Sequence, residues 1–324
     1  MTMDYVSLGK SGLCSSVIGL GGGSSGRFGL KKGGTKADAI RLIRIAVDEG
    51  VTFFDGAGLA GGVDDVLGEA LAGCRERVLI STKVHLGHDP VIMEGTRLAN
   101  LASGWVARRR GTVCSGRTLR KYVERTLRVL RVEQIDLLNL HSLVLSQYPL
   151  AIEYALPELV RMKEEGKIRA IGVTEGFLSD PGHAMLQAAV ADAHFDTIMV
   201  GFNLKNRSAA KSVLPAAAEA GMGTLNMFVL RGLSGQNHRD KEAQAMSGRF
   251  ARLLREAGIT SLSELAYRYC RHQPGINVVL TGTGDPVHLK KNIAAALAPP
   301  LPGEVLDRLP SILGAGSEGD QYGP

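Results

Sequence analysis

The sequence has little of several features that define whole classes of protein. Its 324 residues include only four cysteines and one tryptophan, and 5% are aromatic. The cysteines are scattered without CxxC spacing, which argues against a disulfide framework or a zinc site and fits a reducing compartment. No run approaches the roughly 18 apolar residues that a membrane-spanning helix needs. The first residues carry no basic segment followed by an apolar run, so we expect a cytoplasmic protein without a membrane partner.

A large excess of one charge is also missing. The net charge is +6, with 22% charged and 44% hydrophobic residues. The densest basic region spans 108–131, but its second half has Leu119, Val123 and Leu130 at helical core spacing. This pattern is typical of the solvated outer face of a helix, and the scarcity of aromatic residues argues further against nucleic-acid binding. We therefore expect no nucleic-acid partner.

What the sequence does contain is a regular alternation of two patterns. Runs rich in β-branched residues predict eight strands, at Ser15–Leu20, Val51–Asp55, Val78–Thr82, Ile135–Leu140, Ile168–Val173, Thr197–Phe202, Gly223–Phe228 and Val278–Thr281. Amphipathic stretches predict helices between them, at Lys36–Glu49, Asp64–Ala72, Thr118–Leu130, Ile152–Glu165, His183–Asp192, Ala209–Ala220, Ser261–His272 and Pro286–Ala296. Thr35 with Asp38 predicts the N-cap of the first helix.

This alternation predicts an α/β fold. Parallel strands need helix-length crossovers, and eight such units favour a single closed (β/α)8 TIM barrel. A doubly wound open sheet fits less well, because no acidic residue ends a second strand about twenty residues after Gly19–Gly23. We expect one domain over residues 1–324, with an N-terminal β-hairpin, a loop insertion at 86–116 and a tail at 298–324 with a short helix at Glu304–Leu309. The insertion is either a lid over the site or surface decoration.

Three ionisable residues close consecutive predicted strands, namely Asp55, Lys83 and His141. In a barrel, the carboxyl ends of neighbouring strands converge on one mouth, where catalytic residues are found. A carboxylate keeps a nearby lysine charged and oriented, and a histidine can polarise a carbonyl oxygen. We therefore predict these three as catalytic residues. His85 and His88 lack a third ligand, so we expect no metal site.

These residues lie in motifs that resemble the aldo-keto reductase family. Its members look like F-D-T-A-x-x-Y-G, then T-K at a strand end, then I-D-L-x-x-x-H. This chain has the corresponding segments in the same order, at Phe54–Gly61, Ser81–Lys83 and Ile135–His141. Further matches are Val66–Leu71, Gly166–Val173 and Thr281–Pro286 with Leu289 and Asn292. The resemblance implies a barrel in which NADPH delivers a hydride to a carbonyl carbon while the tyrosine protonates the oxygen.

The main departure from the family pattern is at position 60. The family places its acid, a tyrosine, five residues after the aspartate, and this chain has Ala60 there. Lys83 and His141 are retained, so the chain resembles an atypical member. Besides His141 or a bound water, His85, Tyr148 and Tyr154 are candidates to replace the missing proton donor.

The resemblance also implies a cofactor site. We predict NADP(H), with NAD(H) or no cofactor as alternatives, and contacts at Gly22, Thr174, Glu175, Met199, Met227, Phe228, Thr283, His288 and Asn292. Thr174 and Glu175 replace the Ser-Asn pair that holds the nicotinamide amide, and Met199 replaces a glutamine. For Met199 and Phe228, plain barrel packing is an equally open interpretation. Backbone N–H groups at the start of the helix after Asp285 would suit an anion.

Three functions remain open on the sequence. The first is hydride transfer between NADP(H) and a small-molecule carbonyl, alcohol or polyfunctional substrate. The second is a non-redox activity, such as that of a lyase, dehydratase, cyclase or isomerase of secondary metabolism, with Lys83 and His141 as acid and base. The third is a binding protein on a retired enzyme scaffold. The sequence predicts neither the substrate nor the oligomeric state.

Overall fold

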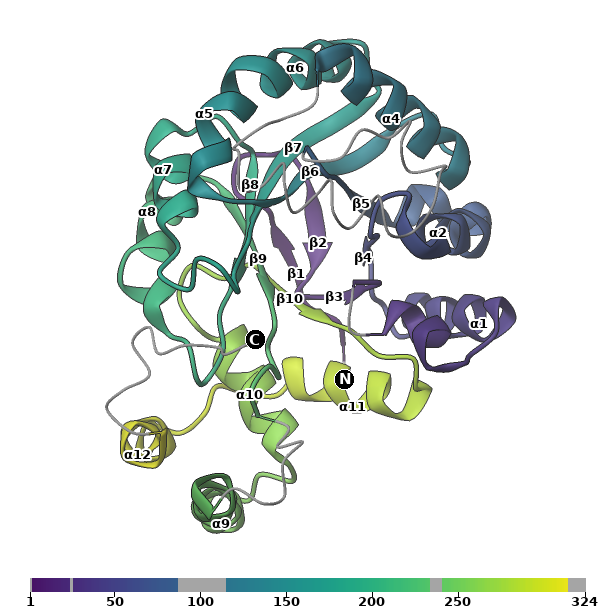
Figure 1. The fold of residues 1–324 in the computed structure, drawn as a ribbon. Coiled ribbons are helices and arrows are strands. Elements are labelled where there is room, and N and C mark those ends of the chain that lie inside the picture. Colours follow the sequence, from purple (N-terminus) through teal and green to yellow (C-terminus); the bar gives the residue numbers. More distant parts are fainter. Residues whose placement is uncertain (1, 24–25, 87–114, 234–240, 314–324) are drawn as a thin grey trace.

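Eight parallel strands close into a barrel in the order β10-β3-β4-β5-β6-β7-β8-β9 (Figure 1). The computed structural model describes residues 2–23, 26–86, 115–233 and 241–313. The barrel strands are β3 (Ile18–Gly21), β4 (Phe53–Asp55), β5 (Leu79–Val84), β6 (Ile135–Leu143), β7 (Ile168–Glu175), β8 (Thr197–Gly201), β9 (Gly223–Met227) and β10 (Val278–Thr281). The predicted TIM barrel is confirmed.

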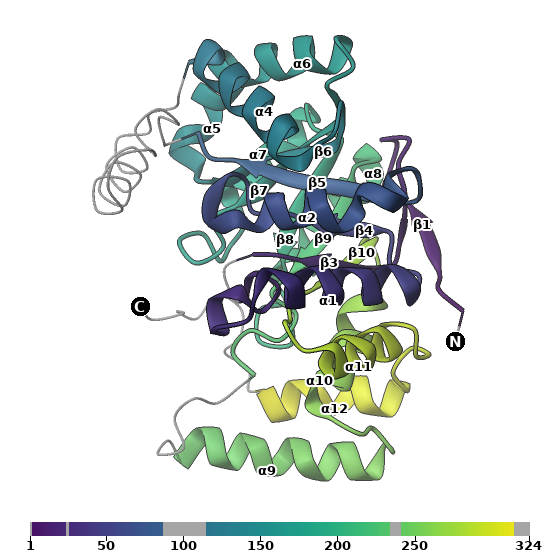
Figure 2. The same cartoon turned by 90° about the vertical axis from the view of Figure 1, so that its right-hand side faces the viewer.

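One predicted strand proves to be two. Within Ser15–Leu20, the chain divides at Val17 into β2 (Cys14–Ser16), which pairs antiparallel with β1 (Tyr5–Ser7), and the barrel strand β3. This is the expected N-terminal hairpin. It lies at the end of the barrel where the strands begin (Figure 2), and its connection places Leu8 and Leu13 among the interior side chains of the barrel.

Helices surround the barrel on its outside (Figure 1). They are α1 (Lys36–Asp48), α2 (Val63–Leu71), α4 (Gly116–Leu130), α5 (Tyr148–Leu150), α6 (Leu156–Glu164), α7 (Ala184–Asp192), α8 (Val213–Ala220), α10 (Leu262–Arg271) and α11 (Pro286–Ala296). Short turns of 3-10 or π helix join them at η1 (Arg27–Lys32), η2 (Ala60–Gly62), η3 (Ala72–Arg77), η5 (Leu145–Gln147), η6 (Ala151–Ala155) and η7 (Ser208–Lys211). Thr35 caps α1 in a capping box with Asp38, as predicted.

Two further helices lie outside this ring, α9 (Lys241–Glu256) and α12 (Gly303–Leu313), and they pack together (Figure 2). The sequence did not predict α9, and it predicted α12 shorter, at Glu304–Leu309. Most of the 86–116 insertion and the end of the 298–324 tail lie outside the described residues. No helix in the described part of the chain is long and apolar enough to cross a membrane.

The period of two along each strand separates the barrel interior from the helix layer. Apolar side chains fill the lower interior, among them Phe53, Leu79, Leu137, Ala170 and Met199. Two or four residues further along β4, β5, β6 and β7, the same face carries polar side chains. The fold therefore has an apolar floor and a polar mouth at the carboxyl ends of the strands.

Candidate active site

Lys83 and Asp55 form a buried ion pair between neighbouring strands at the barrel mouth. The Lys83 Nζ donates to Asp55 Oδ1 at 2.6 Å and Oδ2 at 2.5 Å, and to the Gly56 carbonyl at 2.6 Å. Their side chains are 6% and 5% exposed. An ammonium has three N–H groups, and these three acceptors use all of them. Lys83 is therefore held as a fixed positive charge, and it has no spare proton for a ligand in this geometry.

Two residues that the sequence analysis missed extend this pair into the barrel. Ser81 Oγ donates to Asp55 Oδ1 at 3.0 Å, and Asn139 Nδ2 donates to Ser81 Oγ at 3.0 Å. Both are fully buried. They precede Lys83 and His141 by two residues, so they share the inward face of β5 and β6. That spacing is the signal that could have identified them.

His141 lies beside His85 at the same mouth. The His141 Nδ1 is 2.7 Å from His85 Nε2, and the two rings meet edge to face with centroids 4.1 Å apart. Because one nitrogen must donate and the other accept, the two imidazoles share a proton. A register shift in β6 between Leu140 and Leu143 follows His141 directly, and such irregularities commonly re-aim side chains near functional sites.

The two tyrosines proposed as alternative donors lie elsewhere. The Tyr148 hydroxyl donates to Asp192 Oδ2 at 3.0 Å in the helix layer, and burial raises its pKa further above the ordinary value. Tyr154 is 51% exposed on η6, outside the barrel. Of the three alternative donors, the structure brings only His85 to His141.

The turn that carries position 60 is held by residues beneath it. Tyr122, on α4, accepts a hydrogen bond from the Leu59 N–H at 2.9 Å. Asp64 accepts from the Ala57 N–H at 3.0 Å and from Thr82 Oγ1 at 2.5 Å. Burial raises the pKa of Asp64 to about 7, although both hydrogen bonds lower it. The turn therefore keeps a defined backbone without a tyrosine at position 60.

The predicted nicotinamide contacts are largely committed to partners within the chain. Thr174 Oγ1 accepts from the Ser142 N–H at 2.6 Å. Glu175 faces the helix layer, with a fully buried side chain whose oxygens accept from Gly201 N–H at 2.7 Å and bond His183 Nδ1 at 2.8 Å. This corrects the prediction for Glu175, because period-two alternation turns it away from the mouth when Thr174 points inward.

His183 bridges Glu175 and Ser208, because its Nε2 lies 2.9 Å from Ser208 Oγ. Ser208 Oγ also lies 2.6 Å from Asn206 Oδ1, an acceptor. The single hydroxyl proton belongs to that shorter bond, which makes His183 the donor to Ser208. The three residues resemble a Ser-His-acid triad, but no base among the described residues accepts the Ser208 proton. Their hydrogen bonds instead connect the end of β7 to η7.

Other predicted cofactor residues are divided between the interior and the rim. Met199 is 2% exposed and belongs to the apolar interior cluster, which favours the packing interpretation over a contact with the nicotinamide ring. Met227 is partly exposed at the end of β9. Phe228 packs on Phe177, with centroids 5.5 Å apart, and the Arg231 guanidinium lies 4.8 Å above its ring. Gly22 donates its N–H to the Asp55 carbonyl at 2.7 Å.

The predicted phosphate segment follows β10. Thr283 Oγ1 accepts from the Asp285 N–H at 3.0 Å, and His288 is exposed. Asn292 is buried and donates to Thr281 Oγ1 at 2.8 Å. The Asp285 side chain caps α11 by accepting from the Val287 N–H at 2.7 Å. This carboxylate occupies the helix start that we had expected to suit an anion.

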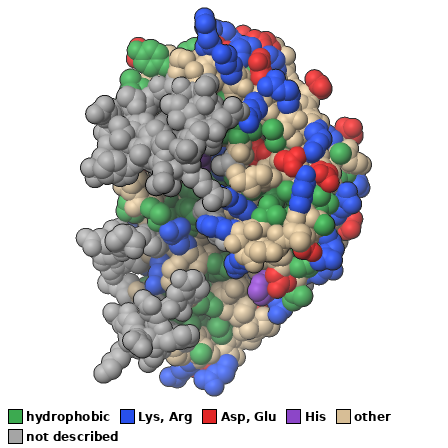
Figure 3. Space-filling model, turned by 45° about the vertical axis from the view of Figure 1, so that its right-hand side comes forward, with side chains coloured by type: hydrophobic (Ala, Val, Ile, Leu, Met, Phe, Trp, Pro, Cys, Tyr) green, Lys and Arg blue, Asp and Glu red, His purple; other side chains and the backbone are tan. Residues whose placement is uncertain are grey.

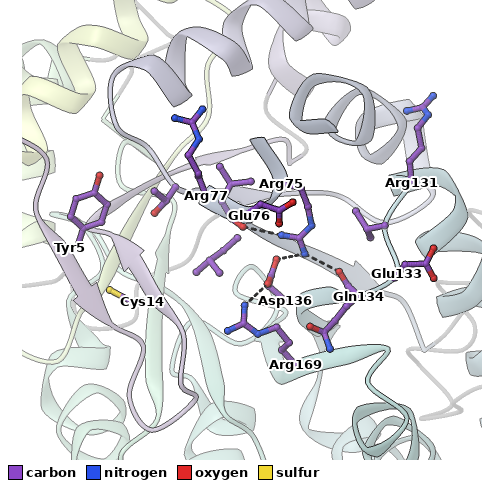
Figure 4. Close-up of a pocket in the computed structure, with 14 residues that line it drawn as sticks. Tyr5, Cys14, Arg75, Glu76, Arg77, Arg131, Glu133, Gln134, Asp136 and Arg169 are labelled. Atoms are coloured by element: carbon purple, nitrogen blue, oxygen red, sulfur yellow. Dashed lines mark hydrogen bonds and ion pairs between the residues drawn. The ribbon is translucent and has the colours of Figure 1, made fainter. Parts of the chain in front are cut away.

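A separate cavity of about 660 Å³ lies at the opposite end of the barrel (Figure 4). Its floor is Asp136, whose carboxylate accepts from Arg75 at 2.6 Å, from Arg169 at 2.8 Å and from the Ile80 N–H at 2.8 Å. Asp136 is buried and belongs to the outward face of β6. Its partners come from η3, β5 and β7, so the cluster joins three neighbouring strands.

Comparisons with known proteins agree with the motifs. A sequence model of the Aldo/keto reductase family matches residues 17–313. The chain is 29% identical over 316 residues to the aldo-keto reductase YhdN of Bacillus subtilis, covering 89% of this chain and 87% of that protein. Among solved structures, the holo form of the aldo-keto reductase AKR11C1 from Bacillus halodurans matches with a TM-score of 0.75 at 22% identity, over 99% of both chains. An aldo-keto reductase from Klebsiella pneumoniae in complex with NADPH matches with a TM-score of 0.72 at 20% identity, over 100% of this chain and 98% of that chain.

Proposed function

The chain belongs to the aldo/keto reductase family, a family of oxidoreductases, and from that premise we propose that it transfers a hydride between NADP(H) and a carbonyl or alcohol substrate. The observation that carries the proposal is the ion pair of Lys83 and Asp55 beside the His85–His141 pair at one barrel mouth. A held positive charge and a proton-sharing pair are what a developing alkoxide requires. The bound dinucleotide would supply the hydride.

The phosphate end of NADP(H) fits the residues present. Thr283 is partly exposed, and His288 and Lys291 are exposed, on the segment that follows β10. Lys291 has no ion pair within the described residues, so its charge is available to a phosphate. The structure of the Klebsiella pneumoniae relative with NADPH supports the same cofactor. At the nicotinamide end, Thr174 and Glu175 are committed, so Met227 and Phe228 are the proposed contacts that remain.

We assign the proton of the missing tyrosine to the histidine pair. In the direction of reduction, His141 would give its proton to the carbonyl oxygen while the carbonyl carbon takes the hydride of NADPH, which leaves as NADP⁺. His85 would then pass a proton to His141 through their hydrogen bond and take one from solvent. The positive charge of Lys83 stabilises the developing negative charge on the oxygen, and Asp55 holds that lysine in place, without either residue exchanging a proton. The saturation of the Lys83 ammonium counts against the non-redox alternative, which needs that lysine as an acid or a base.

The test is a screen of aldehydes and ketones with NADPH, following loss of NADPH absorbance and identifying the alcohol product. Reduction that disappears in His141→Ala supports the proposal. If no carbonyl is reduced although NADPH raises the Tm as a bound ligand should, the redox assignment fails. A product of unchanged oxidation level would instead favour the non-redox function.

A further inference from the structure

Arg27 is a cation at the barrel mouth that the proposed reaction does not use. It begins η1, in the loop after β3, and its guanidinium lies against Gly61 in the neighbouring turn. A Cβ on Gly61 would be 2.5 Å from the Arg27 Cζ, so no larger residue fits there without displacing the guanidinium. Gly61 directly follows Ala60. The charge of Arg27 thus lies beside the turn from which the family's tyrosine would act.

The backbone around Arg27 fixes the direction of its side chain. Arg27 and Phe28 have φ angles of 47° and 56°, in the left-handed region that non-glycine residues seldom adopt. The Phe28 ring is buried and fills the space beside Gly22, where a Cβ would lie 2.7 Å from the ring. Such strain persists where the surroundings enforce it, and it gathers at functional sites.

Among the described residues, the guanidinium of Arg27 has no counter-charge. It is half-buried, and within the described residues it makes no hydrogen bond or ion pair. Asp55, at the end of the neighbouring strand, binds Lys83, and Asp65 binds Lys36 and Arg131, so these carboxylates have other partners. The described surface beside the grey segments shows several Lys and Arg side chains (Figure 3). A desolvated charge is costly unless something pairs with it.

We propose that Arg27 binds an anionic group of the substrate, so that the enzyme prefers aldehydes or ketones that carry a carboxylate or a phosphate. A guanidinium presents several N–H donors in a planar fork that matches both groups. The reduction of such a substrate rests on the proposed function, whereas its binding to Arg27 does not. A phosphate of the cofactor is a second anion that Arg27 could bind, and the experiment distinguishes it from a substrate anion.

The test compares 4-carboxybenzaldehyde with its neutral methyl ester, using NADPH and the variants Arg27→Gln and Lys32→Gln. Lys32 is an exposed cation of the same loop and controls for general charge. We expect Arg27→Gln to lower kcat/KM for the carboxylate substrate about 10- to 100-fold, to leave the ester within about 2-fold, and to leave the KM for NADPH unchanged. Lys32→Gln should change neither substrate by more than about 2-fold.

Equal losses on both substrates, or a raised KM for NADPH, would overturn the proposal and assign Arg27 to the fold or to the cofactor. A separate measurement keeps the two proposals distinct. If no carbonyl is reduced, calorimetric titration with 4-carboxybenzaldehyde and its ester still reports binding. Carboxylate binding that is lost in Arg27→Gln supports the anion site while hydride transfer fails, and equal binding to both proteins overturns it. The Tm of each variant checks folding.

Discussion

The two ends of the barrel each hold a buried aspartate beside cationic side chains, yet they differ in which way the aspartate faces. Asp55, where β4 ends, faces the interior and holds Lys83 beside a histidine pair. Asp136, where β6 begins, faces outward and joins Arg75 and Arg169 under a cavity of about 660 Å³. We propose that similar charges serve different tasks, with chemistry at the mouth and cohesion of strands at the other end. The carboxyl ends of the strands, and not the presence of a cavity beside a buried aspartate, are therefore our criterion for the site.

The largest effect should come from the mouth. We expect His141→Ala to lower kcat for carbonyl reduction by about 10²- to 10⁴-fold, because it removes the positioned acid, with little change in the free energy of unfolding. His85→Asn should lower kcat less, since it removes only the residue that returns the proton. Steady-state kinetics of both variants would test this, and an unchanged kcat in His141→Ala would show that the acid lies elsewhere.

The opposite result is expected at the other end. Asp136→Ala leaves Arg75 and Arg169 without their shared carboxylate and should lower the free energy of unfolding by about 3–5 kcal/mol. The lower figure is the better guide, because the Arg169 side chain is 43% exposed. Denaturant unfolding measures the loss. The kcat of the remaining folded protein should be unchanged, and a drop in kcat would break the division of roles between the two ends.

Asp64, beneath the mouth, links stability to pH. Its pKa is about 7 in the folded protein and 3.8 in the reference state, so the folded chain holds a proton that the unfolded chain releases. Stability should therefore fall as pH rises from about 4 to about 7 and then level off, by at most about 4 kcal/mol. Asp64→Asn should flatten this part of the Tm profile between pH 4 and 8, and an identical profile would contradict the assignment.

The smallest effect should come from a substitution of Asp65, a partly exposed aspartate that also binds two cations. Its loss in free energy of unfolding is the reference for the loss at Asp136. The Asp65 carboxylate binds Lys36 and Arg131, but its side chain is 39% exposed. Asp65→Ala should lower the free energy of unfolding by no more than about 1 kcal/mol. Equal losses in Asp65→Ala and Asp136→Ala in the same denaturant assay would mean that burial does not set the value of these ion pairs.

The strands and the ion pair could be predicted because they follow from local patterns. Each β-branched run contains a barrel strand, and Asp55, Lys83 and His141 lie at or near the carboxyl ends of theirs, so parallel pairing brought them to one mouth. The split at Val17 was missed because an antiparallel partner, β1, decides it. The helix α9 was missed because its sequence has few large apolar residues before Phe250, so its periodic apolar pattern was short.

The remainder of the site depends on contacts between distant segments. Tyr122 holds the Leu59 backbone from 63 positions away, and nothing local to either residue indicates this. The error at Glu175 had a local signal that went unused. Once Thr174 faces inward, its neighbour on the strand must face outward, and a resemblance that pairs both residues with one ligand overlooks that geometry.

The anchoring of Lys83 has a consequence for how this barrel can diversify. Its three acceptors come from Asp55 and from the backbone of Gly56, and none comes from position 60. A change of the side chain at position 60 would therefore leave the charge behind it in place. The proton donor and the charge that supports it are separable parts of this barrel mouth, so one could be redesigned without rebuilding the other.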